Sequence, residues 1–410
     1  MVTQYFRPEP ARIVSSLADE LRDRGHDVQV LTAFPSYPSG ELYAEWVQSR
    51  TYQNAEYGHR VVRVRSHIYH GVNPIRRMAN YLSFGVNAAR EICCFKNVDV
   101  AYVYATQMTA AIPAQLLRLF KGIPYVLHVQ DLWPESIAGS GMVGANSGTV
   151  LDFALRGWLR ATYRNASGVI GIAPTMADTL VARGAQAEHT HAVYNWAPPV
   201  TPTVKSKVPV PRLNAEAVAS QPSDGDLRLM YAGNLGEMQD IDTLLRAFVL
   251  LKGRPIRLDI FGDGVAEGRL RRLRSELALD TVHFHGRVDP KFIGQFSLAA
   301  HFHIITLKDL PVFRMTIPSK FQVALANGRP VISNVAGDLA NLIEQHGVGL
   351  TAAPGDPDAL AGAILKAAEI DDQARSRMAE SARRLYDSEM SVEHAVDRIE
   401  SVLSCAVPAS

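Results

Sequence analysis

The chain has 410 residues, 47% hydrophobic and 20% charged, which is ordinary for a globular protein of two or three domains. Its net charge of +1 gives no global sign of nucleic-acid binding. Cys93, Cys94 and Cys405 form neither a disulfide framework nor a metal-binding pattern, which suits a reducing cytoplasm. We expect neither a signal peptide nor a membrane-spanning segment, so only peripheral membrane contact stays open.

The first half of the sequence alternates strands with helices, as in an α/β fold. The loop after the first strand has Ala11 and Arg12 where a phosphate-binding turn carries glycines, so we expect it to contact an acceptor. A surface loop rich in Pro and aromatic residues is expected at 34–43. The expected strands are 2–6, 27–32, 61–65, 99–104, 124–129, 168–172 and 191–194, and the expected helices are 13–21, 75–95, 110–120 and 151–163.

Residues 50–96 are basic, with eight Lys or Arg against two Asp or Glu. The expected helix at 75–95 has these apolar and basic positions: Met78, Leu82, Val86 and Ile92; Arg76, Arg77 and Arg90. Such a helix either packs on its domain with a solvated basic edge or lies on an anionic membrane surface. The second reading places Arg76 and Arg77 at the inner face of the cell membrane.

Two ionisable residues lie at the end of the expected strand 124–129. His128 and Asp131 would sit at its carboxyl end, where open α/β sheets place their chemistry. A strand histidine is also commonly a core residue that the backbone satisfies, and for His128 alone that reading is favoured.

Residues 196–225 are rich in Pro, Ser and Ala, which is typical of an interdomain linker. We therefore expect domains at 1–195 and 226–387, with 388–410 forming a helix that crosses back to the first domain. The strands expected after the linker are 227–231, 256–261, 281–285, 304–306 and 331–332, and the helices are 241–251, 270–277, 360–367, 374–385 and 392–403.

A further helix is expected to begin near Pro318, which suits a first helical turn, with Thr316 or Ser319 as its cap. A helix N-terminus attracts phosphate, and Lys308, Arg314 and Lys320 would add positive charge. We hypothesise that residues 307–334 bind the diphosphate of a sugar nucleotide. An ordinary strand–helix–strand unit with a solvated basic loop explains the local pattern equally well.

Several segments occur in an order shared with a known family: QYFRPEP, RGHDVQVLT, FPSYPSG, HVQDLWPES, AGNLGEMQDIDTLLRAF, FGDG, HFHGRV and LKDLPVF…IPSKFQ…ANGRPVI. They resemble glycosyltransferase family 4, in the bacterial polysaccharide branch that includes N-acetyl-L-fucosamine transferases. The resemblance implies a GT-B fold, with two Rossmann-like domains facing across a cleft. It also implies retaining transfer from a nucleotide diphosphate sugar, with UDP expected, to a glycan, lipid-linked or small-molecule acceptor. Neither a metal nor a cofactor is expected.

The resemblance assigns donor-binding roles to these residues: Gly233, Asn234 and the loop to Gln239 beside the phosphates; Asp263 and Gly264 in a neighbouring turn; Arg287 and Val288 at the base; Ser319 and Lys320 at the diphosphate. It assigns contact with the donor sugar to His128 or Asp131.

The chain departs from the family at four positions. Family members commonly carry Arg and Lys where this chain has Asn234 and Gln239, and glutamates where it has Met315 and Val323. We therefore expect Lys308, Arg314 or Lys320 to supply the phosphate-binding charge. A nucleotide-sugar epimerase on the same fold, or a catalytically impaired partner subunit, stays open as an alternative.

Overall fold

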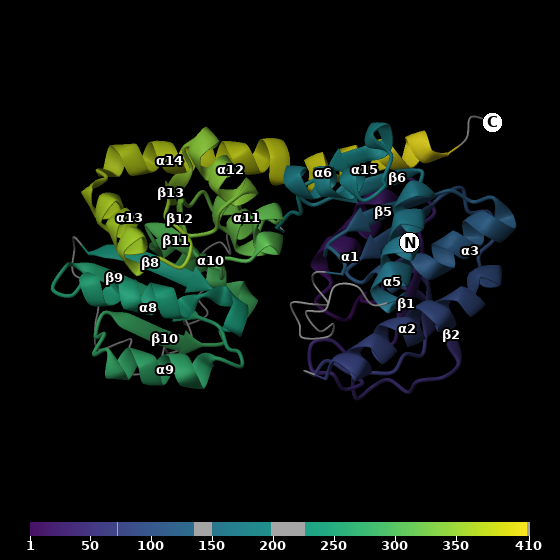
Figure 1. The fold of residues 1–410 in the computed structure, drawn as a ribbon, viewed down its shortest axis with the longest axis horizontal. Helices are drawn as coiled ribbons and strands as arrows, with labels where there is room; N and C mark the ends of the chain where they lie inside the picture. Colours follow the sequence, from purple (N-terminus) through teal and green to yellow (C-terminus); the bar gives the residue numbers. More distant parts are fainter. Residues whose placement is uncertain (72, 135–149, 198–225, 408–410) are drawn as a thin grey trace. The chain divides into compact units, whose positions relative to one another are not determined.

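The computed structural model describes residues 1–71, 73–134, 150–197 and 226–407, and the chain divides into two compact α/β units (Figure 1). The first unit is Met1–Tyr194 with Val392–Ser410, and the second is Asn195–Ser391. The sequence placed these divisions at 195/196 and 387/388. Most of the expected linker, residues 198–225, lies outside the described residues, but Trp196 and Ala197 are buried in the second unit.

The sheet of the first unit is assembled around its first residues. Its strands are β1 (Gln29–Ala33), β2 (Thr51–Glu56), β3 (His59–Val64), β4 (Ala101–Ala105), β5 (Tyr125–Val129), β6 (Gly168–Gly171) and β7 (Thr190–Ala192). They form the orders β1-β3-β2 and β4-β5-β6-β7, and Val2 joins the two through bridges to Leu31 and Val103. The strand expected at 2–6 is therefore wrong in length, because only the residues near Val2 pair with β1 on one side and β4 on the other.

Helices α1 (Arg12–Asp23), α2 (Pro74–Arg90), α3 (Ala111–Lys121), α5 (Val150–Arg164) and α6 (Pro174–Ala182) belong to the same unit. The last helix, α15 (Val392–Ala406), packs against α1, where Arg24 forms ion pairs of 2.5 and 2.7 Å with Asp397 and Glu400. The expected helix at 75–95 ends at Arg90 and is followed by a short 3-10 helix at Ile92–Cys94.

The second unit is a fully parallel sheet. Its strands are β8 (Leu227–Ala232), β9 (Ile256–Phe261), β10 (Val282–Gly286), β11 (Phe302–Ile305), β12 (Val331–Ser333) and β13 (Gly349–Thr351), in the order β10-β9-β8-β11-β12-β13. Its helices are α8 (Ile241–Leu250), α9 (Glu267–Glu276), α10 (Pro290–Ala299), α11 (Ser319–Ala326), α12 (Asp338–His346), α13 (Pro357–Glu369) and α14 (Asp372–Leu385). This strand order is that of a Rossmann fold, whose order reverses between β8 and β11.

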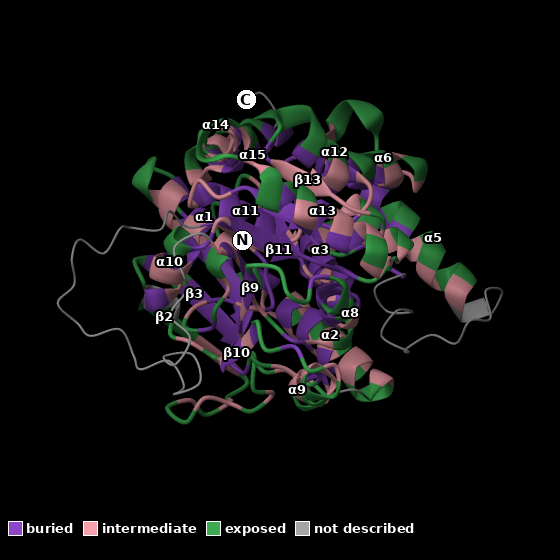
Figure 2. Cartoon of the chain, turned by 90° about the vertical axis from the view of Figure 1, so that its left-hand side faces the viewer, coloured by how far each residue is buried: buried purple, intermediate pink, exposed green. Residues whose placement is uncertain are grey.

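Burial follows the sheets in both units (Figure 2). Strand residues form the core, and α8 and α13 pack together over the sheet of the second unit through residues such as Leu244, Phe248 and Ile364. Of the helices in the described ranges, none combines the length and apolarity that a membrane span requires.

Candidate functional site

The loops after β8 and β11 meet at the point where the strand order of the second unit reverses. The Thr306 hydroxyl donates to the Gln239 carbonyl at 2.6 Å, and the Lys308 N–H donates to the Met238 carbonyl at 3.0 Å. Ligands of open α/β sheets bind at the carboxyl ends of the strands beside such a reversal. The fold therefore brings the Gly233–Gln239 turn and the 307–334 stretch to one place.

Three glycines allow the loops after β8 and β9 to pack in direct backbone contact. Gly233 and Gly262 have φ angles of +149° and +135°, which side chains rarely adopt. A Cβ atom on Gly262 would lie 1.9 Å from the Gly233 carbonyl oxygen, and one on Gly264 would lie 2.6 Å from the Leu235 carbonyl oxygen. Any side chain at Gly262 or Gly264 would push the Gly233 turn away from the sheet.

Lys320 extends from the first turn of α11 to the Gly233 turn. Its Nζ donates to Gln239 Oε1 and lies 5.0 Å from the centre of the Tyr231 ring. A Cβ atom on Gly233 would lie 2.6 Å from Lys320 Cε, so the turn and the lysine stem are in close contact. Burial lowers the pKa of Lys320 to about 8, because the surrounding protein disfavours its charged form. The site therefore holds a poorly solvated cation beside a helix N-terminus.

The expected side-chain cap of α11 is wrong. Pro318 is the N-cap residue, and neither Thr316 nor Ser319 caps the helix, because Thr316 donates instead to the Phe313 carbonyl at 3.4 Å. Ser319 is exposed on the first turn. The Phe321 N–H donates to the Pro318 carbonyl at 2.8 Å, but with no side-chain cap the N–H groups of Ser319 and Lys320 keep their capacity to bind an anion.

Residues that the sequence did not single out hold the turn in shape. The Tyr231 hydroxyl lies 2.9 Å from the Asn234 carbonyl and 3.1 Å from Gln239 Oε1. Asp240, with a left-handed φ of +52°, accepts hydrogen bonds of 2.8 Å from Thr243 and from the Asn334 amide. The Asn334 side chain also accepts from the Leu307 N–H at 3.2 Å, which ties the two ends of the 307–334 stretch together.

The other predicted cations differ in how free their charge is. Arg314 forms a two-pronged ion pair of 2.9 Å with Asp309, so its charge is already balanced. Lys308 is exposed. Burial raises the pKa of Asp240 and the Lys308 charge opposes that rise, whereas a hydrogen bond from Arg269 lowers the pKa of Asp242 and the Lys308 charge adds to that fall. Of these three predicted cations, Lys320 is the one whose charged side chain contacts the Gly233–Gln239 turn in the described structure.

The segment expected at the nucleotide base lies beside the same turn. The Gly262 N–H donates to the Gly286 carbonyl at 2.8 Å, and exposed Arg287 lies 3.8 Å from the Asp263 carboxylate. Val288 packs on the small cluster formed with Phe261. Asp263, Gly264, Arg287 and Val288 therefore line up after β9 and β10, next to the Gly233 turn.

In the first unit, His128 and Asp131 have different environments. His128 is fully buried in β5, shares a 2.6 Å hydrogen bond with the Tyr102 hydroxyl, and lies against the Tyr104 ring. Burial lowers its pKa to about 3, so it is neutral at physiological pH. This is the environment of a core histidine, although its Nε2 atom has no hydrogen-bond partner among the residues that the structure describes.

Asp131 is exposed, yet enough protein surrounds its carboxyl that burial raises its pKa to about 6, with the Arg77 charge acting against that rise. Arg77 donates to the Tyr81 hydroxyl at 3.3 Å. Burial lowers the pKa of His70, whose ring contacts Tyr37, and the Arg77 charge adds to that fall. Arg77 of α2 therefore interacts electrostatically with both Asp131 and His70.

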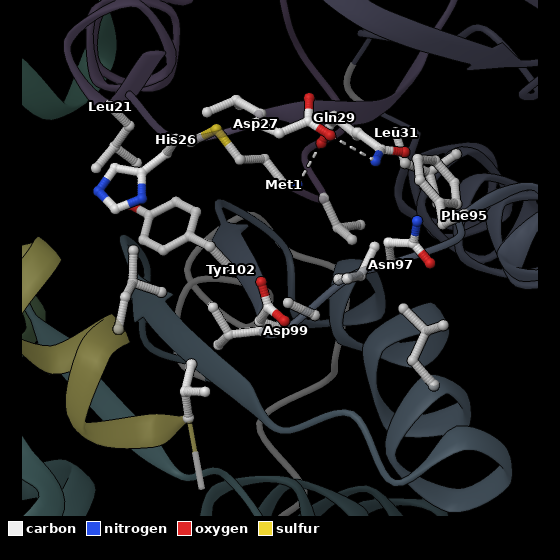
Figure 3. A pocket seen from close by; sticks show the side chains of 18 of the residues that line it. Met1, Leu21, His26, Asp27, Gln29, Leu31, Phe95, Asn97, Asp99 and Tyr102 are labelled. Atoms are coloured by element: carbon white, nitrogen blue, oxygen red, sulfur yellow. Dashed lines mark hydrogen bonds between the residues drawn. The ribbon is translucent and has the colours of Figure 1, made fainter. Parts of the chain in front are cut away.

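A cavity of the first unit lies at the other edge of this sheet (Figure 3). It measures about 230 Å³ and is lined by residues that precede β1 and β4, such as Asp27 and Asp99, and by the Met1 amine. That amine donates to the Gln29 carbonyl at 2.5 Å, and burial lowers its pKa to about 5. Because His128 and Asp131 lie at the carboxyl ends of the strands, this cavity is not part of the predicted site.

No three His, Cys, Asp or Glu side chains converge on a possible metal position within the described ranges.

Comparisons with known proteins connect both units to one family. Residues 10–196 match the model of a glycosyl transferase 4-like domain, and residues 226–369 match that of glycosyl transferases group 1. A probable glycosyltransferase of Pseudomonas aeruginosa, WbjE, is 26% identical over 62% of this chain and 62% of its own length. A putative colanic acid biosynthesis glycosyl transferase of Escherichia coli K12, WcaI, is 24% identical over 87% of this chain and 88% of its own.

A solved structure matches the fold. That of Anabaena Alr3699/HepE in complex with UDP and glucose has a TM-score of 0.68 at 18% identity, covering 98% of both chains. The predicted α/β GT-B fold class is confirmed, whereas none of these names supports the N-acetyl-L-fucosamine likeness. The two family models cover most of the chain, one on each unit. The chain therefore belongs to glycosyltransferase family 4, in its bacterial polysaccharide branch, and is a glycosyltransferase with a GT-B fold.

Proposed function

We propose that this glycosyltransferase transfers a sugar from a nucleotide diphosphate sugar, UDP-linked, to a glycan, lipid-linked or small-molecule acceptor, with retention and without a metal. The observation that supports a nucleotide diphosphate sugar as the donor is the contact of Lys320 with the Gly233 turn, at the reversal of the strand order. The complex of the similar HepE fold with UDP and glucose supports the same choice.

The departing diphosphate gains negative charge during transfer, and the second unit offers it two kinds of partner. The first-turn N–H groups of α11 would donate hydrogen bonds, and Lys320 would supply a full charge. A phosphate oxygen would replace Gln239 Oε1 as the acceptor for Lys320. Since the lysine is already desolvated, little solvent reorganisation accompanies that exchange.

In this proposal the protein positions and polarises the reactants, and the leaving phosphate takes the proton of the acceptor hydroxyl on the same face of the sugar. Asp131 orients the donor sugar, because it is the accessible member of the His128–Asp131 pair. His128 would contact a sugar through Nε2 only after the residues that cover it move.

Donor choice is tested by calorimetry with UDP, GDP and dTDP and with a panel of their sugars, followed by donor hydrolysis assays. We expect UDP to bind most tightly and a UDP-sugar to be hydrolysed slowly without acceptor. The anomeric configuration of a transferred product, read by NMR, tests retention. Preferential binding of GDP or dTDP would overturn the UDP assignment, and an inverted product would overturn the proposed stereochemistry.

A further inference from the structure

Helix α2 carries an apolar stripe on its solvent side. Ile75, Leu82 and Val86 are 79%, 45% and 46% exposed, and Ala79 between them is exposed as well. At 3.6 residues per turn, positions 75, 79, 82 and 86 lie on one narrow sector of the helix. The residues that α2 buries are Asn80, Phe84, Gly85 and Ala88. The helix thus packs on its domain, as one of the two sequence readings expected, but Leu82 and Val86 do not take part in that packing.

Close packing on the buried side prevents α2 from turning its stripe inward. A Cβ atom on Gly85 would lie 2.7 Å from the Thr109 carbonyl oxygen and 2.9 Å from Ile112 Cδ1, so the helix backbone lies directly on the start of α3. Asn80 is buried, donates to the Tyr69 carbonyl at 3.0 Å and accepts from the Gln4 amide. Rolling the helix would break these contacts, so the stripe is a stable part of the surface.

The apolar surface recurs on the neighbouring helix. Leu119 and Phe120, at the end of α3, are each 72% exposed. Lys121 Nζ donates to the Ile92 and Phe95 carbonyls at 3.0 Å, so this end of α3 lies beside the residues that follow α2. Single exposed apolar residues are ordinary, whereas several on two packed helices indicate an interaction surface.

The charges around the stripe indicate its partner. α2 contains no Asp or Glu, and exposed Arg76 and Arg90 flank the stripe near its two ends. A second copy of this face would bring like charges together in a two-fold contact, which disfavours self-association. Anionic lipid head groups complement the same arrangement. Arg77 lies on the opposite side of α2, near Asp131, and does not belong to this surface.

We propose that the outer face of α2 docks on an anionic lipid bilayer. Ile75, Leu82 and Val86 enter the boundary between head groups and acyl chains, and Arg76 and Arg90 contact lipid phosphates. This inference needs no assumption about donor or acceptor, so it stands or falls separately from the proposed transfer reaction.

Co-sedimentation of the full chain with vesicles tests it. The wild type should bind phosphatidylethanolamine vesicles that contain phosphatidylglycerol, bind phosphatidylcholine vesicles weakly, and dissociate as salt rises. Arg76→Ala/Arg90→Ala should lower the partition coefficient about 30-fold, since each basic residue contributes about 1 kcal/mol near an anionic surface. Ile75→Ser/Leu82→Ser/Val86→Ser should lower it at least tenfold, as roughly expected for lost apolar burial.

Matched controls lie on the second unit. Lys252→Ala/Arg254→Ala removes the same charge, and Val249→Ser/Leu250→Ser/Leu298→Ser alters residues that are 36%, 52% and 49% exposed. Both controls should bind vesicles like the wild type, and all variants should unfold near the wild-type temperature. If the two α2 variants bound vesicles with the same partition coefficient as the wild type, the proposal would be overturned. A dimer that only the Ser triple variant dissociates, seen by sedimentation velocity, would overturn it in favour of a second copy.

Discussion

Replacing Lys320 by Met tests the proposed donor site directly, because Met keeps most of the apolar stem and removes the charge. A charge-assisted hydrogen bond to the diphosphate contributes about 1.5–3 kcal/mol. At 1.4 kcal/mol per tenfold, its loss should weaken UDP binding and slow transfer by roughly one to two decades. If the bond strengthens as the leaving group gains charge, kcat should fall in addition to the rise in KM.

The fold should tolerate Lys320→Met. Burial already disfavours the ammonium, as its lowered pKa of about 8 shows, so removing the charge relieves a desolvation cost. Gln239 Oε1 loses one donor, but the Tyr231 hydroxyl remains 3.1 Å away. Thermal unfolding of the variant should therefore occur at or above the wild-type temperature.

The same lysine predicts a pH dependence. Below a pH of about 8 the free protein carries the Lys320 ammonium, and above it the charge is lost. A bound diphosphate favours the charged form and raises the pKa in the complex, so UDP affinity should fall as pH rises above about 8. The Lys320→Met variant should show no such fall.

Calorimetry with UDP and steady-state kinetics with varied donor measure these effects, and exposed Lys252→Met serves as the matched control. Wild-type affinity and turnover in Lys320→Met would refute the reasoning. A loss of affinity in Lys308→Met instead would move the phosphate-binding charge to the loop after β11.

Three further predictions concern the turn, the sugar contact and the metal. Gly262→Ala should lower both the unfolding temperature and UDP affinity, because its Cβ would lie 1.9 Å from the Gly233 carbonyl oxygen. Gly286→Ala is the control, since Gly286 has a φ of +70° but a Cβ there would have no atom within 4 Å. Equal losses in both variants would contradict the packing argument. Burial raises the pKa of Asp131 to about 6, so a mechanism that needs the carboxylate predicts that transfer activity rises as pH increases through about 6. Asp131→Asn should be slower than the wild type and should lack that rise. A wild-type pH profile of activity in the variant would remove Asp131 from the mechanism. Transfer should persist in EDTA, and a complete loss that Mn²⁺ or Mg²⁺ restores would show that a metal is required.

Local sequence patterns determined the α/β alternation and several elements of the site. The strand at Ile256–Phe261 and the helix that starts beside Lys320 were foreseen, since β-branched runs, glycines and prolines act through short-range backbone preferences. The hairpin of β2 and β3 was missed. Its turn at Tyr57 and Gly58, with φ angles of +54° and +80°, lacks the Asn or Asp that usually marks such a turn.

Only the tertiary structure decided which of the predicted groups meet. The sequence shows which residues of α2 are apolar, but the close approach of α3 to Gly85 decides that Leu82 and Val86 face solvent. The same packing places Arg76 and Arg77 on different sides of the helix. The pairing of Arg314 with Asp309, and of Lys320 with Gln239 from a loop 81 residues away in sequence, likewise depends on the fold. Burial of His128 and desolvation of Lys320 have the same origin, because solvent exposure is set by all the elements packed around a residue and not by its neighbours in the chain.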